Sequence, residues 1–397
     1  MLAAIDAAVE SVALEVYIFG EGSLGRQFLA ALLAAKNRGV RVRVLVDAFG
    51  SLELPATFWQ PLRAAGGEVR VFNPLAVGRL GIRNHRKLLA CDGRVAFIGG
   101  FNIANEYEGD GVTRGWCDVG CRLTGALATQ LEDSFDRLFA LADFRHRPFV
   151  RLRRSRARRT LVGPREQLLL SGPGRGASPL YRALRKDLRV AAGGDRPEFL
   201  SARWRARLRR GVAGATESAL DNPGARPGVV RIVVAYFLPP WQLRRELQRV
   251  AKRGGRVELI LAGQSDVVVS QLAARSLYQR LLRAGVEIYE YEPQVLHAKL
   301  FIVGGVAYAG SANLDFRSLK LNYELMARFE EPATVAQANA IFEALRARSR
   351  RIDARAWKNS RSFWTRWKER LANLLLARVD PYLSLRQWRA LPKGVQA

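Results

Sequence analysis

The stretch NHRKLLACDGRVAFIGGFN (residues 84–102), with its later counterpart LHAKLFIVGGVAYAGSANLD (residues 296–315), decides the fold. Each begins with a His-x-Lys unit and continues with an apolar run, a Gly-containing turn, a second short apolar run, and Gly-Gly or Gly-Ser ahead of an Asn. His85 and His297 are two of only three histidines in the chain. Imidazole is the side chain that changes charge near neutral pH. The two copies therefore predict an active site with two histidines, one that attacks and one that transfers a proton.

The repeat extends beyond the histidines. Residues 35–47 (AKNRGVRVRVLVD) match residues 251–262 (AKRGGRVELILA), and residues 62–74 (LRAAGGEVRVFNP) match residues 281–293 (LLRAGVEIYEYEP). In both halves these segments precede the histidine and come in the same order. An ordered series of this kind indicates that one structural module is used twice.

Helical and strand patterns alternate in both halves, which is typical of α/β modules with a mixed or parallel sheet. We therefore expect an α/β fold of two pseudo-repeated α/β/α modules, with the active site at their interface. The first module is predicted to hold a helix that ends near Ser11, strands at 12–19, 40–46 and 68–72, helices at 24–37, 56–65 and 129–142, and the hairpin at 85–100. The chain divides into a first module (1–144), a basic linker or insertion (145–228), a second module (229–350) and a Trp- and Arg-rich amphipathic tail (351–397).

The predicted linker opens with a basic run in which eight arginines between residues 145 and 159 are interrupted by no acidic residue. The segments EQLLLSGPGRGAS (166–178) and RALRKDLRV (182–190) allow a strand and a helix to restart. Residues 190–228 have weak periodicity and many Gly and Pro residues, so we expect an inserted loop that is partly disordered.

The predicted tail carries four of the eight tryptophans of the chain. Trp364, Trp367, Leu371, Leu374 and Leu375 fall on one face of a helix, and basic residues occupy the rest. This pattern suits a membrane–water interface. The alternative is a helix that packs on the core of the protein itself.

The chain is strongly basic, with a formal net charge of +28 and a pI near 11.1. Such a charge favours nucleic acid or an anionic membrane as a partner, although a coding bias toward Arg and Ala would give the same composition. Cys91, Cys117 and Cys121 are too few for a disulfide framework and do not favour a zinc site. No run reaches the ~20 apolar residues of a membrane span, and no secretory signal is visible.

The motif residues resemble those of the phospholipase D superfamily, whose pattern is His-x-Lys-x4-Asp, then Gly-Gly or Gly-Ser, then x-Asn. Phrases such as "FIGGFNIANEY" and "GSANLDFRS" are similar to the bacterial cardiolipin synthases, over nearly all of residues 8–143 and 229–326. Members of that group usually begin with one more strand, so we expect the start at Met1 to be truncated. The residues that carry the motif are His85, Lys87, Asp92, Gly99, Gly100 and Asn102 in the first copy, and His297, Lys299, Gly310, Ser311 and Asn313 in the second.

The chemistry of the motif suits a phosphodiester. Lysines can neutralise its anionic oxygens and asparagines can donate hydrogen bonds to them, while one histidine attacks phosphorus and the other transfers protons. The resemblance implies that His85 is the nucleophile and His297 the acid/base, although pseudo-symmetry allows the reverse. It also implies that Asp118 and Glu324 orient the two imidazoles. No cofactor or metal is expected. The catalytic set is then His85, Lys87, Asp92, His297 and Lys299, with Asn102, Asn313, Ser311, Asp118 and Glu324 as supporting or phosphate-binding residues.

The second motif has Gly304 where the pattern has Asp, and its stretch to Gly-Ser is one residue shorter. Either the Asp was replaced and a turn residue lost, or the Asp itself was deleted. In both cases we expect reduced rather than absent activity.

The function that the resemblance implies is transphosphatidylation, in which a phosphatidyl group passes from phosphatidylglycerol to a second phosphatidylglycerol and glycerol is released. The expected partner is an anionic phospholipid surface, and the expected location is peripheral, on the cytoplasmic side of the cell membrane. The alternatives are hydrolysis by water, a different donor lipid, a nuclease of the same superfamily, and a weakly active or inactive membrane-binding paralogue. Nucleic acid is the less favoured partner, because no nucleic-acid-binding module is recognisable.

Overall fold

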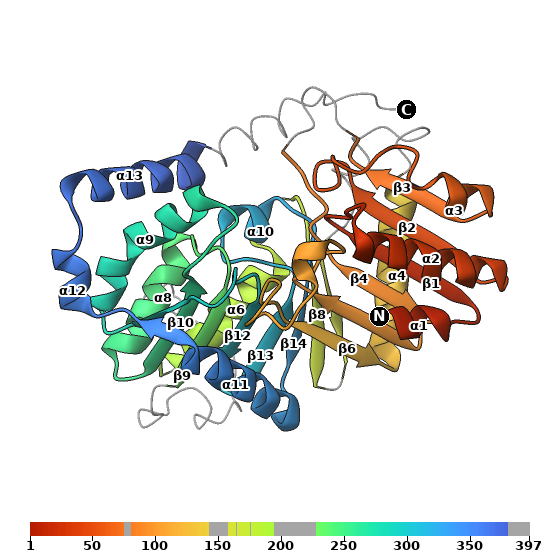
Figure 1. Ribbon diagram of the computed structural model, residues 1–397. Helices are drawn as coiled ribbons and strands as arrows, with labels where there is room; N and C mark the ends of the chain where they lie inside the picture. Colours follow the sequence, from red (N-terminus) through yellow and green to blue (C-terminus); the bar gives the residue numbers. More distant parts are fainter. Residues whose placement is uncertain (75–80, 143–157, 164, 175, 194–227, 380–397) are drawn as a thin grey trace, which may run out of the picture.

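The computed structural model describes residues 1–74, 81–142, 158–163, 165–174, 176–193 and 228–379. Its strands form two sheets, one of six strands and one of nine, and helices pack on the faces of both (Figure 1). The predicted α/β class is confirmed.

The first sheet has the strand order β3-β2-β1-β4-β5-β6. Its first three strands are parallel, and β4, β5 and β6 add to β1 in antiparallel fashion. All six residues of β1 are buried, as expected for a central strand with both faces covered. The strands are β1 (Ser11–Val16), β2 (Arg41–Asp47), β3 (Glu68–Phe72), β4 (Leu88–Cys91), β5 (Val95–Gly99) and β6 (Gly120–Thr124).

The second sheet contains the same arrangement. Within its order, β15-β11-β10-β9-β12-β13-β14-β8-β7, the six strands from β11 to β14 repeat the order and directions of the first sheet. The sequence repeat is therefore a repeat of structure. The strands are β7 (Arg159–Val162), β8 (Glu166–Ser171), β9 (Val229–Val234), β10 (Arg256–Ala262), β11 (Glu287–Tyr291), β12 (Lys299–Val303), β13 (Val306–Gly310), β14 (Glu324–Phe329) and β15 (Ser349–Arg351).

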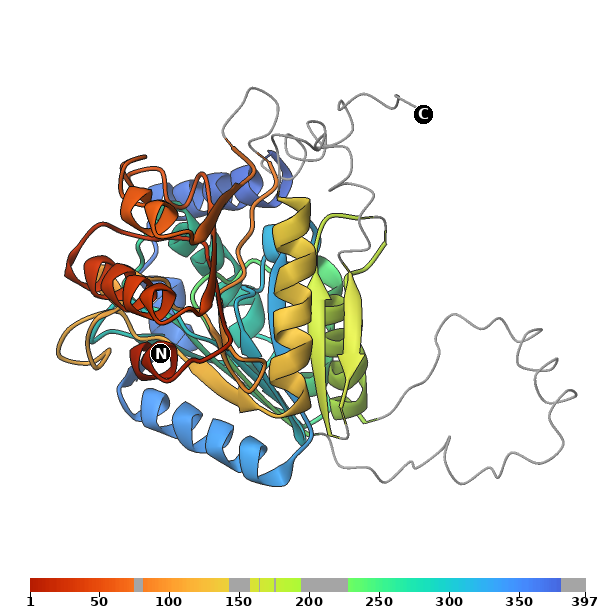
Figure 2. The same ribbon diagram turned by 90° about the vertical axis from the view of Figure 1, so that its right-hand side faces the viewer.

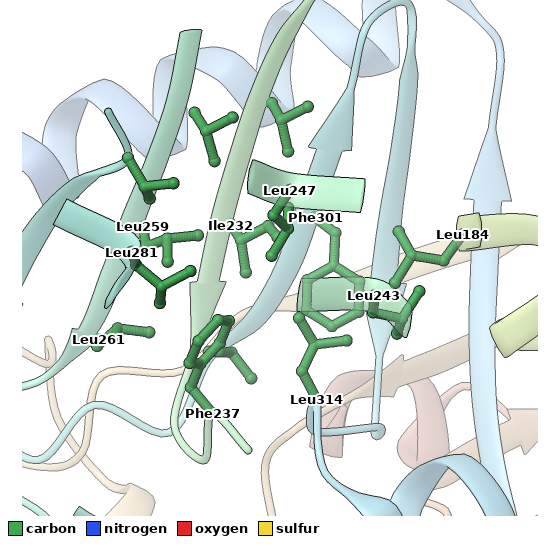
Figure 3. Close-up of a cluster of buried hydrophobic side chains, with 14 of the residues drawn as sticks. Leu184, Ile232, Phe237, Leu243, Leu247, Leu259, Leu261, Leu281, Phe301 and Leu314 are labelled. Carbon is green, nitrogen blue, oxygen red and sulfur yellow. The ribbon is translucent and has the colours of Figure 1, made fainter. Parts of the chain in front are cut away.

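Part of the region expected to be a linker belongs to the second module. Strand β8 pairs with β14 along its whole length, and α6 (Pro179–Ala191) packs into the second core. Figure 3 shows Leu184 of α6 beside Leu243 and Phe301. The assignment of residues 159–191 to a linker was too broad, because their apolar runs fill a sheet edge and a helix layer. The arginines from 145 to 156 and residues 194–227 lie outside the described residues.

The two sheets meet through the helix α4 (Ala126–Leu141). Leu131 and Phe135 of α4 share one core cluster with Ile98 of the first sheet and with Leu168 and Leu325 of the second. Figure 2 shows the gold helix α4 alongside the yellow-green strands β7 and β8. One helix thus joins the two modules in a continuous apolar layer.

The remaining helices cover the outer faces. In the first module α1, α2 and α3 pack on the face opposite α4, and in the second α6, α8 and α9 lie on one face and α11 on the other. Within the described ranges, no helix is long and apolar enough to cross a membrane. The helical elements not yet given are α1 (Leu2–Asp6), α2 (Ser23–Asn37), α3 (Gln60–Ala64), η1 (Asn105–Tyr107), α8 (Trp241–Lys252), α9 (Val268–Leu282), α10 (Phe316–Lys320), α11 (Pro332–Ala347), α12 (Ala354–Asn359), α13 (Phe363–Leu374) and η3 (Leu375–Val379).

One predicted strand is shorter in the structure than the sequence suggests. The strand expected at 12–19 ends at Val16, since residues 17–19 form the loop that carries Tyr17 toward His85.

The tail divides into two parts. Trp357 of α12 is buried against Tyr278, whereas Trp364 and Trp367 of α13 are exposed. Trp388 lies outside the described residues.

Candidate active site

His85 lies just before β4, where the chain of the first module touches the second. Its backbone N–H donates to the carbonyl of Tyr323 at 3.0 Å, and the N–H of Tyr323 donates to the carbonyl of Arg83 at 2.9 Å. Glu324 is the next residue after Tyr323. The backbone therefore fixes the His85 segment against the Glu324 segment of the other module.

His297 is held in the same way by the first module. Its N–H donates to the carbonyl of Cys117 at 2.7 Å, and the N–H of Cys117 donates to the carbonyl of Val295 at 2.9 Å. Asp118 is the next residue after Cys117. Each histidine segment thus forms a short parallel bridge with the carboxylate-bearing segment of the opposite half.

The side chains complete these two crossed pairs. Nδ1 of His85 lies 3.1 Å from each carboxylate oxygen of Glu324, and Nδ1 of His297 lies 2.7 Å from Oδ2 of Asp118. A carboxylate at Nδ1 favours a proton on that nitrogen. With Nδ1 facing a carboxylate, Nε2 of each imidazole is the atom that can attack or exchange a proton. Nζ of Lys299 also lies 3.1 Å from Nε2 of His297 and 2.8 Å from its Nδ1. The structure brings both histidines and both predicted carboxylates together.

Lys87 and Lys299 are buried beside their histidines. Nζ of Lys87 donates to the carbonyl of His85 at 2.8 Å, and Nζ of Lys299 donates to the carbonyl of His297. Burial lowers the pKa of Lys87 to about 7 and that of Lys299 to about 8. Two poorly solvated ammonium groups make the site strongly attractive to an anion, since charges interact more strongly where water is excluded.

Burial dominates the protonation of the other groups as well. It lowers the pKa of His85, and for His297 burial and then the nearby Lys299 hold the pKa well below the usual value. Burial raises the pKa of Asp118 to about 6, although Lys299 opposes the shift. In the free protein both imidazoles are therefore neutral near pH 7, and a bound anion would favour their protonation.

The two asparagines occupy equivalent places beside the histidines. Oδ1 of Asn102 accepts from the N–H of Ile18 at 3.0 Å, and Oδ1 of Asn313 accepts from the N–H of Tyr236 at 3.3 Å. Each carboxamide is held through its oxygen by the loop after β1 or β9. This leaves the amide nitrogen as the group that donates, which suits the phosphate-binding role expected for both.

The hydroxyl of Ser311 holds the carboxylate of Glu324. Its hydroxyl donates to Oε2 of Glu324 at 2.5 Å and accepts from the N–H of Leu325 at 3.0 Å. The matching position in the first half is Gly100, where a Cβ would lie 2.3 Å from Oδ1 of Asp118. The Gly-Gly and Gly-Ser pairs of the motif thus accommodate and position the two carboxylates, and Ser311 is a positioning residue.

Asp92 lies away from the histidines, because it follows the opposite end of β4. Its carboxylate accepts backbone hydrogen bonds from Val9, Glu10 and Ser11 at 2.8–3.1 Å and so fixes the start of β1. Its place in the predicted catalytic set is corrected to a structural one. The motif places four residues between Lys87 and Asp92, and these four residues are the strand β4.

Gly304 occupies the position of Asp92 in the second half. The N–H of Asp92 donates to Ser11 and that of Gly304 donates to Val229, each at the start of the central strand. Both residues have a positive φ, 55° for Asp92 and 60° for Gly304. The Asp was therefore replaced rather than deleted, and the second turn is shorter by the residue after it. Gly304 is remote from His297 for the same reason that Asp92 is remote from His85.

Tyr107 is a site residue that the sequence analysis did not single out. Its hydroxyl lies 3.5 Å from Nε2 of His297 and accepts from Nδ2 of Asn102 at 2.7 Å, and its ring lies 5.3 Å from the imidazole. Comparison of the two halves could have found it, because the residue five positions after Asn102 is Tyr107, whereas Ser318 follows Asn313 at that spacing. Trp116 adds a second ring near His297, at 5.6 Å. The two halves of the site therefore differ, because the rings of Tyr107 and Trp116 lie beside His297.

A family model described as "Cardiolipin synthase, PLD-like domain" matches residues 1–138 and 227–346. The chain belongs to this phospholipase D-like family. The two matched segments coincide with the repeated parts of the two sheets. The resemblance drawn from the motif residues is thereby confirmed.

Curated relatives support the same family. The chain is 32% identical to "Cardiolipin synthase" of Geobacillus kaustophilus (strain HTA426), over 82% of this chain and 59% of that protein. It is also 32% identical to "Cardiolipin synthase B" of Escherichia coli (strain K12), over 81% of this chain and 71% of that protein. The match to "Probable cardiolipin synthase YwiE" of Bacillus subtilis (strain 168) is 28% identical and covers 86% and 62%. The chain thus spans about three fifths of the length of the Geobacillus and Bacillus relatives.

A solved structure agrees on the fold. The phosphatidylserine synthase of Haemophilus influenzae Rd KW20 superposes with a TM-score of 0.68 at 14% sequence identity, and the match covers 97% of this chain and 91% of that one. At this identity the match supports the two-module architecture alone.

Proposed function

We propose that this chain is a phosphatidyltransferase of the cardiolipin synthase type. The observation that carries the proposal is the pair of crossed contacts, in which each histidine takes its carboxylate from the other module, 3.1 Å for His85 and 2.7 Å for His297. Two buried lysines complete the set. Two imidazoles that each have a carboxylate at Nδ1, together with two buried lysines, suit the transfer of a phosphodiester through a covalent intermediate.

In the first step Nε2 of His85 attacks the phosphorus of phosphatidylglycerol. A N–P bond forms, the P–O bond to the headgroup glycerol breaks, and the leaving alkoxide takes a proton from His297, which releases glycerol. Lys87 and Lys299 balance the charge on the equatorial oxygens. In the second step His297 accepts the proton of a hydroxyl on a second phosphatidylglycerol. That oxygen attacks phosphorus, the N–P bond breaks, and cardiolipin leaves with both histidines restored.

Two observations support His85 as the nucleophile. The side chain of His85 is 12% exposed and that of His297 is 5% exposed, so His85 is the more accessible. Nε2 of His297 also has the Tyr107 hydroxyl beside it at 3.5 Å. A neighbouring hydroxyl can share a proton with an acid/base histidine, whereas a nucleophile needs its lone pair free.

The substrates would reach the site from an anionic membrane surface, with the protein attached peripherally on the cytoplasmic side. The net charge of +28 favours such a surface. Names of the relatives support phosphatidylglycerol as the lipid, since they are described as cardiolipin synthases.

A lipid product assay tests the proposal. The purified chain is incubated with phosphatidylglycerol vesicles, beside the His85→Ala and His297→Ala variants, and a DNA fragment is offered in a parallel reaction. Cardiolipin and free glycerol from the unmutated chain, absent with both variants, are the expected result. Phosphatidic acid without cardiolipin would make the activity hydrolysis, cleavage of the DNA alone would make it a nuclease, and no product would overturn the proposal.

A further inference from the structure

Helix α13 carries its apolar side chains outward. Phe363, Trp364, Trp367, Leu371 and Leu374 fall within about 100° of one another around the helix, since each residue advances the angle by ~100°. We call this set the aromatic stripe. Phe363 is 71% exposed, Trp364 67% and Trp367 49%. Leu375 and Val379 continue the exposed apolar surface along η3.

The opposite face of α13 holds the helix to the protein through small and polar residues. Nδ2 of Asn373 donates to Oγ of Ser276 on α9 at 2.8 Å, and Ala372 is buried in the core of the second module. Glu369 is buried and forms an ion pair with Arg361 at 2.7 Å. This is the reverse of an ordinary surface helix, which turns its apolar face inward. The fold therefore fixes the orientation in which the stripe faces out.

Basic residues border the stripe on both sides. By helical angle Arg366 and Arg370 lie along one edge and Lys368 along the other, and all three are exposed. The one acidic residue of α13 is the buried Glu369. An aromatic and leucine-rich face with cationic edges is the pattern of a helix that lies in the interface of an anionic bilayer.

The stripe lies on the side of the molecule where the active site is built. Figure 1 shows α13 along the same upper edge as α10, the short helix that follows Asn313. Other exposed apolar side chains follow the carboxyl ends of parallel strands at that edge: Phe49 and Leu52 after β2, Trp241 after β9, and Val267, Val268 and Val269 after β10. The loops that bring Tyr17 and Tyr236 to the histidines leave the sheets at the same strand ends.

We propose that α13 is the membrane-docking helix of this chain, with the aromatic stripe seated among the headgroups of an anionic bilayer and the basic edges on lipid phosphates. This deepens the proposed function, on which it rests, because docking in this orientation presents the active-site edge to the lipid surface. A bilayer suits the stripe better than a second copy of the chain does, because cations border the stripe on both sides and two copies would bring these cations face to face.

The experiment compares the full chain with the double variant Trp364→Ser/Trp367→Ser. Both tryptophans are exposed, so the substitutions leave the packing on α9 in place. The control is Val190→Ser, which changes a side chain of α6 that is 58% exposed and outside the stripe. Binding to vesicles of phosphatidylcholine with phosphatidylglycerol is measured by flotation, and to phosphatidylcholine alone, at low and high salt.

We expect the double variant to bind mixed vesicles at least about tenfold more weakly, and the control to bind like the unmutated chain. Arg366→Gln, Lys368→Gln and Arg370→Gln should each weaken binding about fivefold at low salt and less at high salt, the effect of one basic residue near an anionic surface. Vesicle binding by the double variant equal to that of the unmutated chain would overturn the proposal. If the double variant also has a lower melting temperature than the unmutated chain, the stripe is covered by the chain itself. If instead the unmutated chain is a dimer and the double variant a monomer, the stripe joins two copies.

A second assay separates docking from catalysis. Turnover is measured on a short-chain phosphatidylglycerol kept below its critical micelle concentration, where no surface is present. The double variant should turn over the monomeric lipid like the unmutated chain and lose turnover only on vesicles. Equal loss on both lipids would overturn the docking role. An unmutated chain that binds vesicles through α13 yet yields no product from either lipid would contradict the proposed function and leave the docking helix standing.

Discussion

Nδ1 of His297 lies 2.7 Å from Oδ2 of Asp118, a residue 179 positions earlier in the chain and in the other module. Glu324 stands in the same relation to His85, with 239 positions between them. Neither module holds a histidine together with its own carboxylate. The two pairs form only when the modules pack, so the α4 core and the catalytic geometry depend on the same interface.

Replacing Asp118 with Asn keeps the size of the side chain but removes the charge that fixes the His297 tautomer. We expect turnover to fall by about 10²–10⁴-fold, the range seen when carboxylates behind catalytic or metal-binding histidines are changed. Glu324→Gln should act in the same way on His85. Steady-state kinetics measure both. Adding Asp118→Asn to His297→Ala should cost little more than His297→Ala alone, because groups that act as a unit are not additive; independent losses would contradict the pairing.

Tyr107→Phe keeps the ring against His297 and Trp116 and removes only the hydroxyl beside Nε2. We expect about a tenfold loss of turnover with little change in KM, because the hydroxyl shares the proton that His297 delivers. Tyr17→Phe is the matched control, since Tyr17 meets His85 through its ring, with centroids 5.0 Å apart. Equal effects of the two substitutions on turnover would remove Tyr107 from the proton transfer.

The pH dependence of kcat/KM follows from the buried charges. Burial lowers the pKa of Lys87 to about 7 and of Lys299 to about 8, so both lysines lose their protons as the pH rises through 7–8 and the phosphate loses its counter-charges. Burial raises the pKa of Asp118 to about 6, so this carboxylate loses its charge as the pH falls through 6. The profile should be bell-shaped with its maximum between these values. Lys87→Arg, which stays charged, should flatten the alkaline limb; an unchanged limb would mean that Lys87 does not set it.

The sequence was most informative where the chemistry is local. The His, Lys and Asn residues were found from their spacing, because a strand, a turn and a second strand carry them as one unit. The crossing of Asp118 to His297 was not predictable, since packing between modules decides it. Asp92 shows the limit of a motif, because the four residues of β4 separate it from Lys87 and place its carboxylate on the backbone at the start of β1. Strand β8 was visible as an apolar run, but its pairing with β14 is a nonlocal contact.

Asp92→Ala removes the acceptor of three backbone N–H groups at the start of β1. We expect a loss of about 1–3 kcal/mol in the free energy of unfolding, with kcat unchanged in the folded protein. Gly304→Asp is the reciprocal change. A Cβ at Gly304 meets no atom within 4 Å, and Asp92 already adopts the positive φ required there. Turnover of Gly304→Asp should equal that of the unmutated chain; a large gain would place this turn in the chemistry after all.

Asp187 ties α6 to the second sheet, and its removal tests whether this part of the former linker is structural. Its carboxylate binds Nε of Arg328 at 2.9 Å and accepts from the hydroxyl of Tyr308, and all three side chains are buried. Asp187→Ala leaves the Arg328 guanidinium without its buried partner, although Glu330 still binds it at the surface. We expect a loss of about 3 kcal/mol, near the low end for breaking a buried ion pair, measured by urea denaturation. Asp133→Ala, an exposed change on α4, should stay within about 0.5 kcal/mol. If the two variants were equally stable, residues 179–191 would be only loosely attached to the second module.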